Sequence, residues 1–593
     1  MKQLFQKTAS FLILYCSLYI PKAHSQQRNT SLHRLFENYY QESLQLDPIS
    51  ATFTGAHQYD NQLANDGAVT YLKAKEQFDK KYLQLLTAFS RQSLNTADRI
   101  SFDVLKEILN MDLERLKHHT EYLPMNQFSS IPLLIGQLGS GESAQPFATV
   151  KDYENWQQRI TAFSNWTDTA ISNMRKGVAI GMLLPKALVI KMIPQMISLA
   201  ERDPSKSVFF QPLNKMPASI TGADRARLKQ SFLQSINTQL LPAYQRLADY
   251  LQQEYLPYAT DSAGLSGIPG GRALYDYYVR YFTTTEITPE QLYETGIKEV
   301  ARINAAMEEL KKQLGFKGTL QEFFVFVRTA PQFMPFKTAD EVLQAYRDIY
   351  DKVKPHLHTM LSVVPKATFE IRRVEAFREA SQNGPSYSIG AMDGSRPGIF
   401  YVPVPDPKKI NVTFLGMEAT FLHEAIPGHH YQISLQQENK TLPTFRRSIS
   451  FSAFTEGWAL YCESFGKQLG CYTTIDQQIG ALNNEIHRAI RLVTDVGIHT
   501  GKMTREEAIN YMLTHESISE EDAVTSVERY MAWPGQALTY KTGELEIIRL
   551  REECRKKLGS SFNLVRFNDA LLQQGDMPLH VLEHYLQEWT AKQ

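Results

Sequence analysis

The chain has 593 residues, of which 43% are hydrophobic, and 63 basic side chains balance 63 acidic ones. A chain of this length and composition can bury a large core, in one domain or in two lobes. A net charge of zero, with no block of like charge, argues against a broad nucleic-acid footprint. We therefore expect a globular protein with no nucleic-acid partner.

Residues 1–25 have the features of a secretory signal peptide. Lys2 and Lys7 give a positive start, an apolar run extends from Ala9 to Ile20, and the sequence AHS that ends at Ser25 resembles a cleavage site. The run is too short to span a bilayer comfortably, and its cysteine lies inside it rather than after it. We expect an exported protein, periplasmic or secreted, with no stable membrane anchor; the alternative is an uncleaved anchor helix.

Residues 30–260 carry apolar side chains at helical spacing throughout, with breaks at prolines. Further along, Thr288-Pro-Glu-Gln291 forms a capping box with proline at the first helical position. This box predicts a long helix that ends at Gly315.

A glycine-rich stretch, SAGLSGIPGG at residues 262–271, is the clearest linker in the chain. It is either a hinge or an ordered loop along a cleft. The expected organisation is therefore one helical domain over residues 26–593, or two lobes at 26–265 and 266–593.

Residues 367–374 and 398–404 alternate like β-strands. The second segment contains two prolines, which suit an edge strand, and such a strand can pair with an extended substrate. Arg396 and Tyr401 are accordingly candidates for substrate binding. The alternative is a small structural hairpin.

The stretch Phe421–Tyr431, FLHEAIPGHHY, contains the side chains needed for hydrolysis at a metal ion. Zinc enzymes use neutral imidazoles as ligands and a carboxylate beside the water, often in the helical pattern H-E-x-x-H. Here His423 and Glu424 form the His-Glu pair, but Pro427 occupies the position of the second histidine. Proline removes a helical hydrogen bond and crowds the preceding turn.

We therefore predict a bulge over residues 426–428 that lets a later histidine bind the metal. Spacing does not decide between His429 and His430; we favour His429 and assign His430 to substrate binding. The bland alternative is a histidine-rich helix end that caps its own carbonyls.

A second acidic motif, FTEGWALYCE at residues 454–463, follows after a break. Glu456 is the expected third ligand, and Glu463, two turns further on the same face, is expected to support a ligand. The expected cofactor is zinc.

The combination of motifs resembles the bacterial domain-of-unknown-function 885 family, regarded as zincin-like metallohydrolases. The resemblance covers nearly the whole mature chain, and it is carried by the segments HEAIPGHH, TEGWALYCE, GSRPGIFYV, DVGIHTGKMTREEA and RYMAWPGQALTYKTGE. TEGWA is also similar to a segment of gluzincin aminopeptidases in which the glutamate binds zinc. The resemblance implies a mainly α, zincin-like helical metallopeptidase fold with a small β-sheet beside the metal helix.

One expected helix carries a polar stripe at Arg488, Arg491, Asp495 and His499. The stripe is either a solvated face with ion pairing or a wall of the cleft. The family resemblance favours His499 as a site residue.

Near the C-terminus, Tyr530 and Tyr540 bracket the loop WPGQ. A phenol there can stabilise an oxyanion; we favour Tyr540, with Tyr530 in substrate binding and Lys541 as a carboxylate binder. The alternative is aromatic packing.

Three cysteines, Cys462, Cys471 and Cys554, remain after the signal peptide. Export permits a disulfide between the first two, although unpaired buried thiols are favoured.

Taken together, these features predict an exported zinc peptidase that acts on peptide substrates. His423, His429 and Glu456 hold zinc, Glu424 is the general base, and Tyr540 stabilises the oxyanion. The alternatives are a zinc amidase or esterase on another substrate, and a helical binding protein with a relic metal site. Oligomeric state is left open.

Cleavage after Ser25 predicts that protein recovered outside the cytoplasm begins at Gln26, with or without cyclisation of that residue. N-terminal sequencing and intact mass measure this directly. An exported protein that retains Met1 would contradict cleavage.

Overall fold

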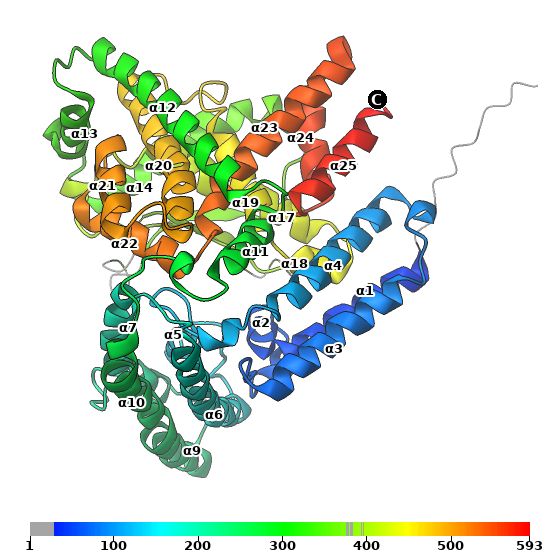
Figure 1. The fold of residues 1–593 in the computed structure, drawn as a ribbon, viewed down its shortest axis with the longest axis vertical. Coiled ribbons are helices and arrows are strands. Elements are labelled where there is room, and N and C mark those ends of the chain that lie inside the picture. The colour runs from blue at the N-terminus through cyan, green and yellow to red at the C-terminus, as the bar shows by residue number, and fades with distance from the viewer. Residues whose placement is uncertain (1–28, 375–378, 380–383, 393, 395) are drawn as a thin grey trace, which may run out of the picture.

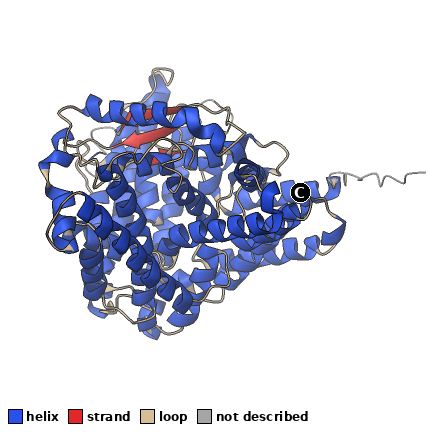
Figure 2. Cartoon of the chain, turned by 90° about the horizontal axis from the view of Figure 1, so that it is seen from above, coloured by secondary structure: helices blue, strands red, loops and turns tan. Residues whose placement is uncertain are grey.

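The computed structural model describes residues 29–374, 379, 384–392, 394 and 396–593, so the expected signal peptide lies outside the described residues. Helices dominate the molecule, and a small sheet lies at one end of it (Figure 2). The predicted mainly α class with a small sheet is confirmed. Among the described helices, none combines the length and apolarity needed to cross a membrane.

The N-terminal half of the described chain is entirely helical (Figure 1). Its helices are α1 Thr30–Leu46, α2 Pro48–Phe53, α3 Val69–Leu86, α4 Thr96–Arg115, α5 Ile131–Gly139, α6 Val150–Ile180, α7 Lys186–Leu199, α8 Gln211–Asn214, α9 Gly222–Ser235, α10 Leu241–Asp249, α11 Gly271–Thr283, α12 Pro289–Gln313, α13 Leu320–Thr329 and α14 Ala339–Val353. The capping box predicted at Thr288 is present at the start of α12.

The small sheet has the strand order β1-β3-β2. Its strands are β1 Phe369–Arg373, β2 Ser386–Ser388 and β3 Gly398–Val402. β1 and β3 are parallel, with Phe369 opposite Gly398, so the two predicted strands do not form a hairpin. β3 is central because the short β2 pairs antiparallel with its other side. The prediction that β3 is an edge strand is therefore wrong, and it has no free edge for a substrate.

The C-terminal half is again helical and surrounds the predicted motifs. Its helices are α16 Met417–Glu424, α17 His429–Glu438, α18 Thr444–Ser448, α19 Ser452–Glu463, α20 Ile475–His499, α21 Arg505–His515, α22 Glu520–Ala532, α23 Thr539–Leu558, α24 Leu564–Gln573 and α25 Leu579–Thr590.

The hydrophobic cores divide the chain differently from the expected boundary at residue 265. Helices α5 to α10 share one core with fully buried Trp156, Phe163 and Tyr244. Helices α1, α3 and α4 instead join the core of the C-terminal half, where the Phe36 ring lies 5.3 Å from that of Phe445 in α18. Residues 26–265 therefore do not have one hydrophobic core of their own: part of this segment packs with the C-terminal half.

The glycine-rich linker is an ordered loop. Gly264 lies against the end of α20, because a Cβ added there would meet the carbonyl oxygen of Ile498 at 2.2 Å. The amide of Leu265 also donates a hydrogen bond to Nδ1 of His499. Cys462, Cys471 and Cys554 are buried and unpaired, as favoured from the sequence.

Asp495 is a buried carboxylate in the middle of the C-terminal core. It accepts hydrogen bonds from Oη of Tyr275 at 2.7 Å and from the amide of Gly535 at 3.1 Å. Burial nevertheless raises the pKa of Asp495 to about 7. The folded state thus holds a proton that the unfolded chain releases near pH 4, so this group lowers stability as the pH rises from about 4 to about 7.

Asp495→Asn keeps an oxygen acceptor but removes the titration. We expect the free energy of unfolding of the variant to fall less between pH 5 and 8 than that of the unchanged protein, by at most about 3 kcal/mol. Urea unfolding across pH measures the difference, with the exposed Asp348→Asn as control. If the free energy of unfolding changed equally with pH in the unchanged protein and in Asp495→Asn, the raised pKa assigned to Asp495 would be contradicted.

Candidate metal centre

The predicted bulge is a complete break between two helices. α16 ends at Glu424, a cis peptide joins Ile426 to Pro427, and α17 begins at His429. Pro427 has no N–H to continue the helical bonding, so the hydrogen-bond ladder of α16 is interrupted at this point. The amide of His430 instead donates to the carbonyl of Ala425 at 3.2 Å.

Glycine is required at the second residue of this break. A Cβ added to Gly428 would lie 1.8 Å from the carbonyl oxygen of His423, so any side chain would force the two helices apart. The indole of Trp458 in α19 donates to the carbonyl of Pro427 at 3.0 Å and fixes the break against the next helix. The break therefore sets where α17 begins relative to α16.

Close packing of α19 on α23 builds the opposite wall. A Cβ added to Gly543 would lie 1.9 Å from the carbonyl oxygen of Ala453, so the two backbones are in contact. One turn before this glycine, Tyr540 stacks on His423 with ring centroids 6.4 Å apart and an interplanar angle of 19°. The phenol predicted to face the metal ligands is therefore beside them.

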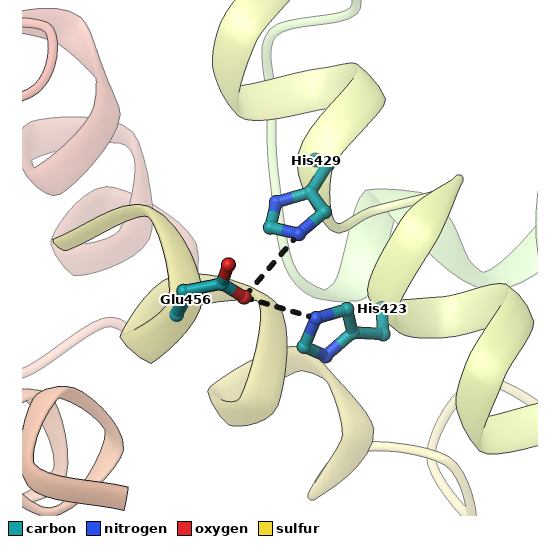
Figure 3. Close-up of side chains that lie close together, drawn as sticks. All are labelled: His423, His429 and Glu456. Carbon is teal, nitrogen blue, oxygen red and sulfur yellow. Dashed lines mark hydrogen bonds and ion pairs between the residues drawn. The ribbon is translucent and has the colours of Figure 1, made fainter. Parts of the chain in front are cut away.

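The structure brings His423, His429 and Glu456 together from three helices (Figure 3). Nε2 of His423 lies 3.3 Å from Oε2 of Glu456, and Nε2 of His429 lies 3.5 Å from the same oxygen. The three ligand atoms all lie within 4.8 Å of one another. His429, rather than His430, completes the group.

These separations fit a small divalent ion. Tetrahedral zinc with ligands at 2.0–2.1 Å places neighbouring ligand atoms about 3.3–3.4 Å apart. The observed distances from Glu456 Oε2, 3.3 Å and 3.5 Å, match that spacing. Two imidazoles and one carboxylate are also a donor set of catalytic zinc sites, which leave one position open.

A second carboxylate orients one ligand. Nδ1 of His423 lies 2.8 Å from Oε1 of Glu463, as expected from the position of that residue two turns after Glu456. Burial opposes charge on the His423 ring, but hydrogen bonds with Glu456 and Glu463 outweigh it and raise the pKa to about 10. By contrast, Nδ1 of His429 is buried without a hydrogen-bond partner among the described residues.

Glu424 is held by the edge strand rather than by a metal ligand. The amide of Tyr387 in β2 donates to Oε2 of Glu424 at 2.9 Å. The phenol of Tyr387 in turn lies 2.9 Å from Nδ1 of His430, and burial lowers the pKa of that imidazole to about 4. His430 thus ties α17 to the sheet, and its role in substrate binding stays a prediction.

Two candidates on the sheet are not brought to the metal group. Phe400 of β3 packs on Phe421 of α16, with ring centroids 5.8 Å apart. Tyr401 follows it and points to the other face of the sheet, where it pairs in register with Arg372. Arg396 is exposed and lies in the loop before β3. Neither residue contacts the three ligand side chains among the described contacts, so the substrate contacts of Tyr401 and Arg396 stay predictions.

Two further candidates are enclosed by other partners. The ammonium of Lys541 is 1% exposed and lies 2.7 Å from carboxylates of both Glu485 and Glu544. Both ring nitrogens of His499 are occupied, since Nε2 donates to the carbonyl of Tyr530 and Nδ1 accepts from an amide. Lys541 and His499 are therefore structural, and neither is free to bind substrate as predicted.

Tyr530 remains near the site, and its neighbour is Arg491, a member of the polar stripe for which the sequence left a solvated face and a cleft wall equally open. The guanidinium carbon of Arg491 in α20 lies 6.0 Å from the Tyr530 ring and 4.4 Å from the Tyr540 ring. The polar stripe at three- and four-residue spacing on α20 was the only sequence signal for Arg491, and it is compatible with a solvated face.

Comparison with known proteins places the chain among bacterial relatives. A family model described as "Bacterial protein of unknown function (DUF885)" matches residues 48–586. The crystal structure of a proposed lipoprotein from Colwellia psychrerythraea is similar over 95% of this chain and 99% of its own, with 26% identity and a TM-score of 0.84. None of the curated proteins compared with the chain matches it.

A second solved structure extends the likeness of fold. A proposed lipoprotein of unknown function from Shewanella oneidensis is similar over 94% of this chain and 100% of its own, with 18% identity and a TM-score of 0.75. At that identity the likeness concerns the fold alone.

Adjacent histidines give a matched test of the metal group. His429→Gln removes an imidazole whose Nε2 faces Glu456, so we expect its zinc affinity to fall by more than the 10–100-fold typical of supporting residues. His430→Gln changes the next residue of the same helix and is expected to retain about one zinc ion per chain. Zinc stoichiometry after dialysis measures both. If His430→Gln lost zinc while His429→Gln retained it, the proposed set of ligands would be contradicted.

Proposed function

This chain belongs to the bacterial DUF885 family, and we propose that it is an exported zinc-dependent peptidase with a zincin-like centre. The observation that carries the proposal is the convergence of His423, His429 and Glu456, with Glu424 directly beside one of them. A bare structural metal site needs no additional carboxylate of this kind.

Three protein ligands would hold the metal. His423 and His429 offer Nε2 atoms, and Glu456 offers a carboxylate oxygen at the spacing expected for zinc. When bound, zinc supplies a Lewis acid and lowers the pKa of a water molecule in the open position. Glu463 keeps the His423 ring oriented through Nδ1.

Glu424 is the proposed general base. One of its oxygens, Oε2, accepts the Tyr387 amide, and no hydrogen bond to Oε1 occurs among the described residues. A carboxylate held at one oxygen keeps its orientation while the other oxygen takes a proton from water and passes it to the leaving amine. The backbone clamp from β2 therefore supports this role.

Tyr540 is the proposed oxyanion donor. Its ring stacks on His423 and is 9% exposed, so the phenol belongs to the wall of the site rather than to the bulk surface. A preorganised O–H aimed at developing negative charge stabilises the tetrahedral intermediate without reorganisation.

Export is supported by two independent features. The first 25 residues have a basic start, an apolar run and a small-residue end. The similar proteins from Colwellia psychrerythraea and Shewanella oneidensis are described as proposed lipoproteins, a class that is exported. For this chain we propose signal-peptide cleavage without a lipid anchor, because Cys16 lies within the apolar run.

The two glutamates of the centre have different roles and should fail differently. Glu424→Gln is expected to retain zinc and fold but to lose at least the 10²–10⁴-fold contribution typical of general-base catalysis. Glu456→Gln is expected to lose zinc affinity, and its activity should return in part with excess zinc. A peptide-library digest read by mass spectrometry, repeated across added zinc, measures both.

Ester and non-peptide amide panels run beside the peptide library distinguish a peptidase from another zinc hydrolase. Near-normal turnover by Glu424→Gln would exclude Glu424 as the general base. Zinc loss from Glu424→Gln with retention in Glu456→Gln would require the ligand assignments to be exchanged.

A further inference from the structure

Arg491 is a buried cation without a counter-ion. Arg491 is only 8% exposed, and its Nε has no hydrogen-bond partner among the residues that the structure describes. Among the described residues it forms no ion pair with a carboxylate, and its polar neighbours are the phenols of Tyr530 and Tyr540. Buried charges in proteins are paired or bind a ligand, because removing an isolated charge from water is costly.

Two other buried arginines in this chain donate to several oxygen atoms, although Nε of Arg446 is also buried without a partner among the described residues. Arg159 donates to the carbonyls of Tyr59 and Gln62 and to the side chain of Gln145. Arg446 donates to carbonyls at the end of α24 and just beyond it. Within the described chain Arg491 has no carbonyl or carboxylate partner, only the phenols of Tyr530 and Tyr540, so a structural role explains it less well than a ligand does.

The surroundings of Arg491 add further polar groups that lack partners. The phenolic oxygen of Tyr530 is buried and also has no hydrogen-bond partner among the described residues. One turn earlier on α20, Arg488 likewise has a buried Nε without a partner and forms no ion pair within the described chain. The carboxylate of Glu516 is engaged through Oε2 by Nδ1 of His487 at 2.8 Å. Its Oε1 is buried without a hydrogen-bond partner, and Glu516 forms no ion pair with Arg491 among the described residues.

This cluster lies beside the metal group. The Tyr540 ring contacts the Arg491 guanidinium on one side, at 4.4 Å, and stacks on the metal-ligand ring of His423, at 6.4 Å. One or two extended residues span about 3.5–7 Å. Two extended residues together with the length of a hydrogen bond are therefore comparable with the separation that the single Tyr540 ring places between the guanidinium and the metal group.

We propose that Arg491, with the phenol of Tyr530 beside it, binds the C-terminal carboxylate of the substrate, so that the enzyme removes one or two residues from the C-termini of peptides. The inference rests on the proposed peptidase function and specifies its substrate class. It assigns to Arg491 the carboxylate-binding role that the sequence suggested for Lys541.

The chemistry of the guanidinium favours this ligand. Its planar fork of N–H donors matches the two oxygens of a carboxylate, and the group remains charged at all relevant pH values. Loss of one partner from a buried charged pair of this kind weakens binding by about 30-fold or more. An uncharged C-terminal amide should be discriminated against by a similar factor.

The test uses the zinc-loaded full-length mature protein and three versions of one short peptide: the free acid, the C-terminal amide, and an amide whose last residue is glutamate. We expect kcat/KM for the free acid to exceed that for both amides by about 30-fold or more. In Arg491→Met this ratio should fall close to one, chiefly through a higher KM for the free acid, and Arg491→Lys should restore part of it.

Arg505→Met is the matched control. Arg505 lies on α21 and already has a counter-ion, Glu528, at 2.7 Å. The control should keep the preference for the free acid, and Arg491→Met should keep its zinc. If Arg491→Met does not fold, the acid-to-amide ratios of the unchanged protein and of Arg491→Lys still decide the matter.

A binding arm separates this inference from the proposed function. In Glu424→Gln, calorimetry should show the free acid binding at least about 30-fold more tightly than its amide, and adding Arg491→Met should remove the difference. Such binding without hydrolysis by the unchanged protein would refute the peptidase proposal but keep the carboxylate site. Equal handling of acid and amide, or preference for the glutamate amide, would overturn the carboxylate assignment.

Discussion

The architecture of the site depends on one local constraint, the break between α16 and α17. Pro427 cannot continue the hydrogen bonding of α16, and Gly428 lies against the carbonyl of His423 where no Cβ fits. The break turns His429 back toward His423, so that both Nε2 atoms face one carboxylate oxygen of Glu456. A continuous helix would direct these two histidines to different faces.

The surrounding helices place further charged and aromatic side chains around the three proposed metal ligands. Contact between the backbones of α19 and α23 brings Tyr540 onto the His423 ring. Glu463 lies behind the same ring, whereas Arg491 lies across the phenol of Tyr540 with no carboxylate partner in the described chain. One wall therefore offers two imidazoles and a carboxylate for a metal cation, and the neighbouring wall offers the Arg491 guanidinium for an anion. A peptide end that presents a carbonyl and a carboxylate is complementary to both.

The sequence predicted those features of the site that depend on the spacing of residues along a single helix. The pairing of Glu463 with His423 followed from its position two turns after Glu456. Partners brought by distant segments could not be predicted: Lys541 and His499 looked available but are enclosed by Glu485, Glu544 and the loop at Leu265. The central place of β3 likewise depends on β2, whose three residues are too few for a periodic pattern.

Anomalous scattering at the zinc absorption edge, from crystals supplied with zinc, tests the central claim most directly. The account predicts one peak per chain at about 2.0–2.1 Å from Nε2 of His423, Nε2 of His429 and a carboxylate oxygen of Glu456. No peak within ligand distance of these three atoms, or a peak on His430 instead of His429, would contradict it.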